Sequence, residues 1–150
     1  MTIYNHIIDD SLEVFMNTAP RYRLVVVPWD GDLDEHQAVD VGREMASVIE
    51  KLDRSDTLGF DFAVEGAFRS LCRKSTFQDE KFGPIVCLKN IGILFEPELG
   101  LNVCELLKWI SKNTLTIVLW RGEISWDRLS FMTPESNIFI NQSDINYFVL

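Results

Sequence analysis

The chain has 150 residues, of which 47% are hydrophobic and 25% charged, so one domain can bury a core without disulfides or metals. The formal net charge of −9 opposes autonomous binding to nucleic acid, which gains affinity when Lys and Arg neutralise phosphates. No apolar run approaches the roughly 20 residues that span a bilayer, and residues 1–6 lack the features of a signal peptide. We therefore expect a single cytoplasmic domain, residues 1–150, that does not bind membranes.

Helical periodicity marks the beginning of the chain. Apolar residues recur every three or four positions from Ile3 to Ala19, and Pro20 stops the run. This pattern predicts an amphipathic helix over residues 1–19, followed by the sheet and helices of residues 20–150. The apolar run Arg23–Val27 is typical of a buried strand.

The turn after that strand stands where a nucleotide-binding protein would place its phosphate loop. Such a loop needs glycines, a lysine and a Ser or Thr in the pattern G-x-x-x-x-G-K-[ST]. The segment Pro28–Gln37 has one glycine, Gly31, no lysine, no hydroxyl side chain and four carboxylates. Its position favours a nucleotide-binding scaffold, whereas its chemistry argues against a nucleotide.

The acidic residues of this turn also have a structural interpretation. Asp32 is placed to cap a helix, and Glu35 follows three residues later, as in a capping box. Carboxylates in the first turn complement the helix dipole. The inner face of the helix is expected from a set of apolar or uncharged positions: Leu33, Gln37, Val41, Met45, Val48, Ile49 and Leu52.

The rest of the chain alternates apolar strands with amphipathic segments. We expect a short strand at Leu58–Phe62 with a short helix after it, and a helix over Leu101–Lys112. Ile91–Phe95 fits either a continued strand or a packed turn. The expected later strands are Pro84–Leu88, Leu115–Trp120, Ile138–Ile140 and Tyr147–Leu150. This alternation predicts a three-layer α/β fold with a mainly parallel central sheet flanked by helices.

Ligands of parallel sheets bind at the carboxyl ends of the strands. Lys89 and Asn90 follow the strand Pro84–Leu88, where an NTPase would normally place an acid that organises magnesium. Arg121 follows the strand that ends at Trp120. Arg121 could sense a phosphate or pair with a nearby acid.

A second register makes Ile91–Phe95 the strand of a Walker B pattern. In this alternative, Glu96 would hold magnesium-bound water, Glu98 would be a base, and backbone amides near Gly31 would cradle the phosphates.

Other cofactor sites have little support. His6 and His36 match no metal-binding spacing, and Cys72, Cys87 and Cys104 are too far apart for a zinc motif. We expect no cofactor, no metal and no catalytic residue, with the three cysteines present as buried thiols. A basic set is expected to be a solvated helix face with its following loop: Arg69, Arg73, Lys74 and Lys81.

Two of the four tryptophans are candidates for a protein interface. Trp29 and Trp126 fall in predicted loops beside Asp30 and Asp127, and an exposed Trp beside charge is a common interface anchor. A Trp that caps the sheet edge is the alternative. We assign Trp29, Asp30, Asp32 and Trp126 to a candidate interface, and Trp109 and Trp120 to the core.

The segment Lys89–Leu101, with its phrase Ile93-Leu94-Phe95-Glu96-Pro97, resembles BrxF, the small P-loop-type component of BREX phage-defence systems. The resemblance continues through Leu106–Trp109 and Asn113–Trp120 to Pro134. It implies a P-loop NTPase-like fold and protein partners in a defence system. It also implies a phosphate loop at Pro28–Gln37 and an acid at position 89, and the chain departs from the family at both.

These observations lead to one hypothesis and two alternatives. The chain is expected to be a non-catalytic adaptor or regulatory subunit of a bacterial anti-phage complex, with other subunits as partners and a possible homo-oligomeric state. The first alternative is an atypical NTPase that uses Glu96 and Glu98. The second is a small acidic binding or immunity protein that covers a basic partner surface.

Overall fold

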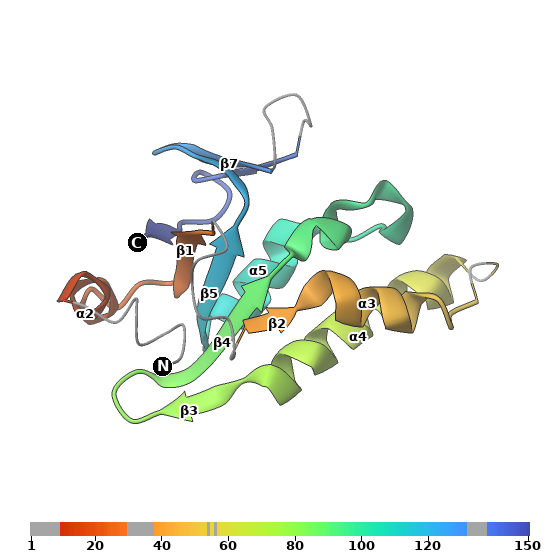
Figure 1. The fold of residues 1–150 in the computed structure, drawn as a ribbon, viewed down its shortest axis with the longest axis horizontal. Helices are drawn as coiled ribbons and strands as arrows, with labels where there is room; N and C mark the ends of the chain where they lie inside the picture. The colour runs from red at the N-terminus through yellow and green to blue at the C-terminus, as the bar shows by residue number, and fades with distance from the viewer. Residues whose placement is uncertain (1–9, 30–37, 54, 56, 132–137) are drawn as a thin grey trace.

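The computed structural model describes residues 10–29, 38–53, 55, 57–131 and 138–150. Its central sheet has the strand order β2-β4-β5-β1-β9, and all four contacts along this path are parallel. A sixth strand, β3, pairs antiparallel with β4. The bounds are β1 Leu24–Pro28, β2 Ala38–Asp40, β3 Phe77–Asp79, β4 Gly83–Lys89, β5 Leu115–Trp120 and β9 Phe148–Val149. The expected α/β fold with a mainly parallel sheet is confirmed (Figure 1).

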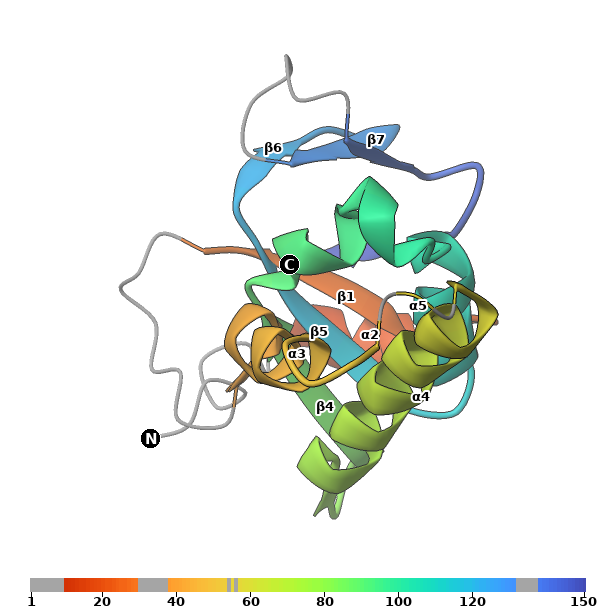
Figure 2. The same ribbon diagram turned by 90° about the vertical axis from the view of Figure 1, so that its right-hand side faces the viewer.

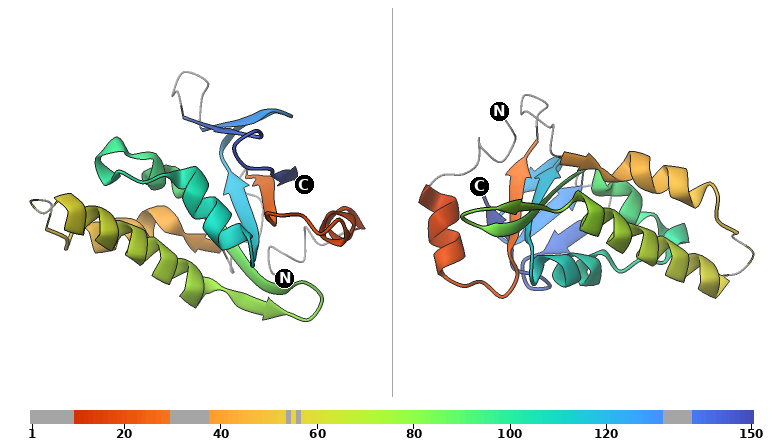
Figure 3. Two further views of the ribbon diagram at one scale, coloured as in Figure 1. Left: turned by 180° about the vertical axis from the view of Figure 1, so that it is seen from behind. Right: turned by 90° about the horizontal axis from the view of Figure 1, so that it is seen from below.

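The sheet is covered by helices on both faces. Helices α3 (Val41–Ile49), α4 (Thr57–Ser75) and α5 (Val103–Ser111) pack apolar residues against one face of the sheet in one core cluster. Helix α2 (Asp10–Asn17) lies on the other side, where Leu12 is fully buried and Phe15 stacks on the Phe148 ring at 4.7 Å. Figures 1 and 3 show this separation, with α2 apart from the three other helices, and Figure 2 shows α3 and α4 in front of the central strands. Among the described helices, none is long and apolar enough to cross a membrane.

A second, three-stranded sheet follows β5. It consists of β6 (Gly122–Ile124), β7 (Arg128–Phe131) and β8 (Phe139–Asn141), all antiparallel. Trp120, the last residue of β5, joins the two sheets because its indole Nε1 donates to the Ser130 carbonyl oxygen at 3.0 Å. The sequence prediction included β8 and β9 but missed β6 and β7, which have only three and four residues.

The predicted strand at Leu58–Phe62 is wrong. These residues lie in α4, which continues to Ser75. Phe60, Val64 and Phe68 bury one face at helical spacing, whereas Phe62 is 74% exposed. The alternation of Phe60 and Phe62 suggested a strand, but in a helix the two side chains point to different faces.

The helix predicted from Leu33 is also wrong at its beginning. Residues 38–40 form strand β2, and α3 begins at Val41 with Asp40 as its N-cap. Val48, expected on the inner face, is 39% exposed. The proposed cap at Asp32 and the positions Leu33 and Gln37 lie outside the described residues, as does most of the predicted helix 1–19 before Asp10.

The segment after β4 is helical and does not continue the strand. Ile91–Phe95 forms the 3₁₀ helix η1, and Pro97–Leu99 forms a second one, η2. Asn90 has a left-handed backbone, with φ 58°, which ends the extended strand. The packed-turn alternative was therefore the better expectation, and the Walker B register at Ile91–Phe95 is wrong because these residues do not form a strand.

The link between the two sheets can be tested by replacing Trp120 with Phe. The change leaves the Ser130 carbonyl without its buried donor, so we expect a loss of about 1–3 kcal/mol in the free energy of unfolding, measured by urea denaturation. Trp126→Phe is the control, because Trp126 is 87% exposed, and it should change stability by less than about 0.5 kcal/mol. Equal effects of the two substitutions would contradict this role of Trp120.

Candidate functional site

The carboxyl ends of the parallel strands bring four chemically distinct side chains together. Trp29 follows β1, Arg121 follows β5, and Asp40 and Lys89 end β2 and β4. Side chains alternate between the faces of a strand, so these four positions share the face of the buried residues Val27, Cys87 and Leu119. This is the face that α2 covers. We call Trp29, Asp40, Lys89 and Arg121 the strand-end cluster.

The centre of the cluster is an indole ring approached by two cations. The Arg121 Cζ lies 3.9 Å from the centroid of the Trp29 ring, and the Lys89 Nζ lies 5.7 Å from it. Such contacts are worth about 0.5–2 kcal/mol each, more where water is excluded. The Trp29 backbone N–H donates to the Trp120 carbonyl oxygen at 3.1 Å, which fixes the start of the turn next to β5. The Trp29 ring itself is partly buried against the core.

Asp40 completes the cluster on the side of β2. It lies directly opposite Lys89 in the parallel register, and its Oδ1 accepts from the Arg43 backbone N–H and from Asn90 Nδ2, both at 3.0 Å. Burial by itself would raise the pKa of Asp40. The two hydrogen bonds and the charges of Lys89 and Arg43 outweigh burial, so the pKa of this carboxyl lies below its usual value.

The backbone of Gly42 packs closely against the Asn90 side chain, which holds Asp40 in place. A Cβ on Gly42 would lie 2.5 Å from Asn90 Nδ2 and 3.2 Å from the Asn90 carbonyl oxygen. Only glycine leaves room there for the Asn90 amide that holds Asp40. The first turn of α3 and the end of β4 therefore pack closely at this edge, and this packing requires glycine at position 42.

The cluster offers a carboxylate, two cations and an aromatic face. Within the parts of the chain that the structure describes, there is no group of three or more His, Cys, Asp and Glu residues that could hold a metal ion. Cys72 and Cys87 are buried thiols, as predicted, whereas Cys104 is only partly buried. Burial raises the pKa of Cys72 to about 12, so its thiol remains protonated at neutral pH.

The residues of the alternative NTPase site that the structure describes lie on different elements. Glu96 and Glu98 are exposed and stand in and beside the 3₁₀ segments, beyond the end of β4. Arg121 is stacked on Trp29. Gly31, the residue assigned to cradle phosphate, lies outside the described residues, as do His6 and His36.

Of the four candidate interface residues, the structure describes Trp29 and Trp126, which lie on different elements. Trp126 is 87% exposed in the turn between β6 and β7, as expected for an interface anchor. Trp29 is partly buried in the strand-end cluster, which corresponds to the alternative of a Trp that caps the sheet edge. Asp30 and Asp32 lie outside the described residues. Trp109, assigned to the core, is only partly buried.

Sequence reasoning placed Asn90 after a strand of this edge but missed Asp40 and Gly42 as members of it. Asp40 directly precedes the apolar positions Val41 and Met45, and Asp is a strong N-cap residue. That signal was present in the sequence, but the acidic run before it offered an earlier cap. The pairing of Asp40 with Asn90 depends on a contact across 50 residues and has no local signal.

No family model, curated protein or solved structure matches this chain.

The depressed pKa of Asp40 predicts a defined pH dependence. A carboxyl whose folded pKa lies below its unfolded value, about 3.9, stabilises the fold above that pH and loses this contribution as the pH falls through the folded pKa. Asp40→Asn keeps an effective N-cap and removes the charge. We expect the variant to be less stable than wild type at pH 7, and the difference to shrink below about pH 4.

The measurement is the urea midpoint of both proteins between about pH 7 and pH 3. In a Lys89→Met background, Asp40→Asn should have a smaller effect at neutral pH, because one of the charges that favour the carboxylate is gone. A pH-independent difference between Asp40→Asn and wild type would contradict this account of the cluster.

Proposed function

We propose that this chain is a non-catalytic, protein-binding subunit built on a P-loop-like fold whose nucleotide chemistry has been lost. The observation that carries the proposal is the strand-end cluster. In a P-loop NTPase a phosphate loop and a magnesium-organising acid stand at one edge of a parallel sheet, after two of its strands. Here β1 and β4 are interior parallel strands, with β5 between them, and they end at the same edge.

The side chains at this edge suit a structural contact better than phosphoryl transfer. Lys89 stands where the acid is required, and it lies in register with Asp40, which already caps α3 and accepts from Asn90. Arg121 stacks on Trp29 at 3.9 Å, so its guanidinium has a structural contact that needs no phosphate. A magnesium ion at the end of β4 would face an ammonium group instead of a carboxylate ligand.

The resemblance of residues 89–120 to BrxF supports a role in a bacterial anti-phage complex. On this proposal the chain contributes a scaffold and surfaces for other subunits, and the cluster stabilises the edge that once held a ligand. Its net charge of −9 favours contact with a basic protein surface over nucleic acid.

Loss of nucleotide chemistry can be tested by titrating the full chain with ATP or GTP and Mg²⁺ in a calorimeter, together with a phosphate-release assay. We expect no binding in the micromolar range and no hydrolysis, because the end of β4 carries Lys89. Micromolar affinity that is abolished by substitutions in Pro28–Gln37 would overturn the proposal. Magnesium-dependent hydrolysis that falls by orders of magnitude in Glu96→Gln, but not in the exposed Glu123→Gln, would establish the atypical NTPase instead.

The protein-binding role makes a prediction for Trp126. This side chain projects from an ordered turn, in which Ser125 Oγ donates to Asp127 Oδ1 at 2.8 Å and the Ser125 N–H donates to the Arg128 carbonyl oxygen at 3.0 Å. An exposed Trp on a rigid turn is suited to a central interface position, where truncation commonly costs about 2 kcal/mol or more. Such a loss corresponds to about a thirtyfold weaker complex.

A tagged chain is used to capture partners from its native host, and Trp126→Ala is compared with Phe62→Ala, the 74% exposed aromatic of α4. We expect Trp126→Ala alone to deplete the captured subunits. Capture of a single basic protein from outside a defence complex would favour the small binding or immunity protein. Equal capture by both variants and wild type would remove Trp126 from the interface.

A further inference from the structure

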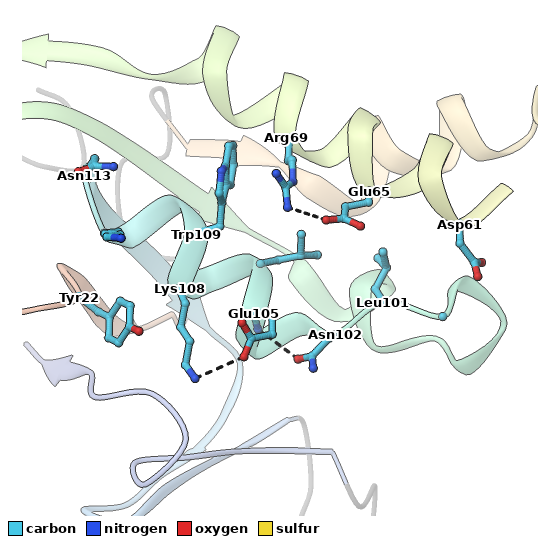
Figure 4. Close-up of a pocket in the computed structure, with 13 residues that line it drawn as sticks. Tyr22, Asp61, Glu65, Arg69, Leu101, Asn102, Glu105, Lys108, Trp109 and Asn113 are labelled. Carbon is cyan, nitrogen blue, oxygen red and sulfur yellow. Dashed lines mark hydrogen bonds and ion pairs between the residues drawn. The ribbon is translucent and has the colours of Figure 1, made fainter. Parts of the chain in front are cut away.

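A groove of about 680 Å³ lies between helices α4 and α5, and charged side chains of its two walls pair with a neighbour on the same helix. Figure 4 shows both contacts. On α4, Arg69 Nη2 donates to Glu65 Oε1 at 2.6 Å. On α5, Lys108 Nζ lies 3.5 Å from Glu105 Oε1. These pairs satisfy one another and identify no ligand for the groove.

Two arginines of α4 meet a tryptophan of α5 beside this groove. The Cζ atoms of Arg69 and Arg73 lie 4.7 and 5.3 Å from the centroid of the Trp109 ring. The expectation that Arg69 and Arg73 belong to a solvated helix face is only partly met, because both guanidinium groups converge on this indole. These contacts connect α4 to α5 and need no ligand.

The second sheet, in contrast, has a free edge at β6. Its strand order is β6-β7-β8, so within the described residues β6 pairs with a strand on one side only. Figure 2 shows β6 and β7 at one end of the molecule. Residues 121–127 are all exposed except Ile124, which is half-buried. Because the N–H and C=O groups of a free sheet edge can pair with another chain, such an edge is a template for an added strand.

At other sheet edges the chain uses its own groups as partners. Beside β9, Gln142 Oε1 accepts from the Tyr147 N–H at 2.7 Å, and Gln142 Nε2 donates to the Tyr147 carbonyl oxygen at 3.2 Å. At β8, the Asn141 carbonyl oxygen accepts from the N–H groups of Asp144 and Ile145 at 3.0 and 3.2 Å. Both arrangements occupy backbone groups that a further strand would need.

The hydrogen bonds of the β6–β7 hairpin fix which backbone groups face the free edge. The Ser125 N–H donates to the Arg128 carbonyl oxygen at 3.0 Å, so Ser125 faces β7. Residues of an antiparallel strand alternate between the two sides, so Glu123 also faces β7. Gly122 and Ile124 therefore direct their N–H and C=O groups to the free side, with the spacing that an antiparallel strand requires.

The side chains of β6 determine which strand fits. Ile124 lies opposite Leu129, which lies opposite Ile140, and this face of the sheet packs on the core. Glu123 is exposed on the other face. In an added antiparallel strand, the residue opposite Glu123 forms a pair without hydrogen bonds, with Cα atoms about 4.5 Å apart. At that distance opposite charges stabilise the pairing and like charges destabilise it.

We propose that the free edge of β6 binds an extended segment of a partner protein, antiparallel to β6, with a basic residue opposite Glu123. Apolar residues on either side of the basic one extend the buried face of Ile124. Trp126, the candidate anchor of the proposed function, follows Ser125 at the end of the same edge, so one segment contacts both. This inference rests on the proposed protein-binding function and names the class of segment that it binds.

Charge selects such a segment over a second copy of this chain or a nucleic acid. The antiparallel register that pairs all of Gly122–Ile124 with the same residues of a second copy places Glu123 opposite Glu123, which destabilises the pairing. A nucleic acid has no peptide backbone to pair with the edge, and its phosphates are repelled by Glu123 and by the net charge of −9. A basic segment is attracted by both.

Strand pairing is tested by fluorescence anisotropy of labelled peptides titrated with the full chain. The probe peptide is Thr-Val-Lys-Val-Thr, in which the two Val amides face β6 when the Lys lies opposite Glu123. We expect N-methylation of both Val amides to weaken binding at least about tenfold, because two hydrogen bonds are lost. N-methylation of the Lys amide is the matched control and should change the affinity less than about twofold, because this amide points away from β6.

Charge selection is tested with the peptide Thr-Val-Glu-Val-Thr, which should bind the wild-type chain at least about fivefold more weakly than the probe. Glu123→Lys should reverse this order of affinities. Glu80→Lys is the control, because Glu80 lies between β3 and β4, at the opposite end of the molecule from the second sheet (Figure 1), and the change in charge is the same. Thermal unfolding followed by circular dichroism verifies that both variants are folded.

The inference is overturned if the probe does not bind, if the two kinds of N-methylated peptide bind equally, or if the order of affinities is the same in Glu123→Lys and wild type. A wild-type dimer in sedimentation velocity that prevents peptide binding would assign the edge to a second copy. Partner capture through Trp126 is measured separately. Failure of the peptide tests alone therefore removes only the β6 edge, whereas loss of all capture removes the protein-binding function.

Discussion

Strand β5 is buried along all six residues, Leu115–Trp120, and the rest of the structure depends on this burial. It pairs with β1 on one side and β4 on the other, each over five residue pairs, so it holds together the two strands whose ends form the candidate site. Its alternate side chains enter two different cores, one under α3, α4 and α5 and one under α2. Trp120, the last residue of β5, connects the central sheet to the second sheet through its hydrogen bond to the Ser130 carbonyl oxygen. A polar substitution inside β5 would therefore place an unpaired polar group in one core or the other, depending on the position.

The same alternation of side chains creates the strand-end cluster. Parallel strands that end at one edge place their final residues side by side, and here those residues are an indole, two cations and a carboxylate. In most α/β proteins such an edge is open to a ligand. In this chain the groups satisfy one another to a large extent, as Asp40 does with Asn90 and the α3 backbone. The Trp29 indole Nε1 is an exception, because it is buried and has no acceptor among the described residues.

Much of the fold follows from local patterns, and the failures have physical causes. The strands Pro84–Leu88 and Leu115–Trp120 are continuous apolar runs of β-forming residues, and the structure has both. Leu58–Phe62 is short enough to fit the period of a strand or of a helix. The helix prevails because Val64 and Phe68 extend the buried face of Phe60 at helical spacing. The short strands β2 and β6 have three residues each, too few for any periodic signal.

The sequence by itself determined the α/β class, the central strands and the absence of a lysine-bearing phosphate loop, because these depend on residue types within short segments. It also placed Lys89 and Arg121 at strand ends. Only the tertiary structure decided that these two cations meet Trp29, that Asp40 lies opposite Lys89 in the sheet, and that Arg69 and Arg73 converge on Trp109. Each of these contacts joins residues from different strands or helices. Strand order and helix packing bring these residues together. Both are stabilised by the burial of apolar surface, which is a non-directional interaction.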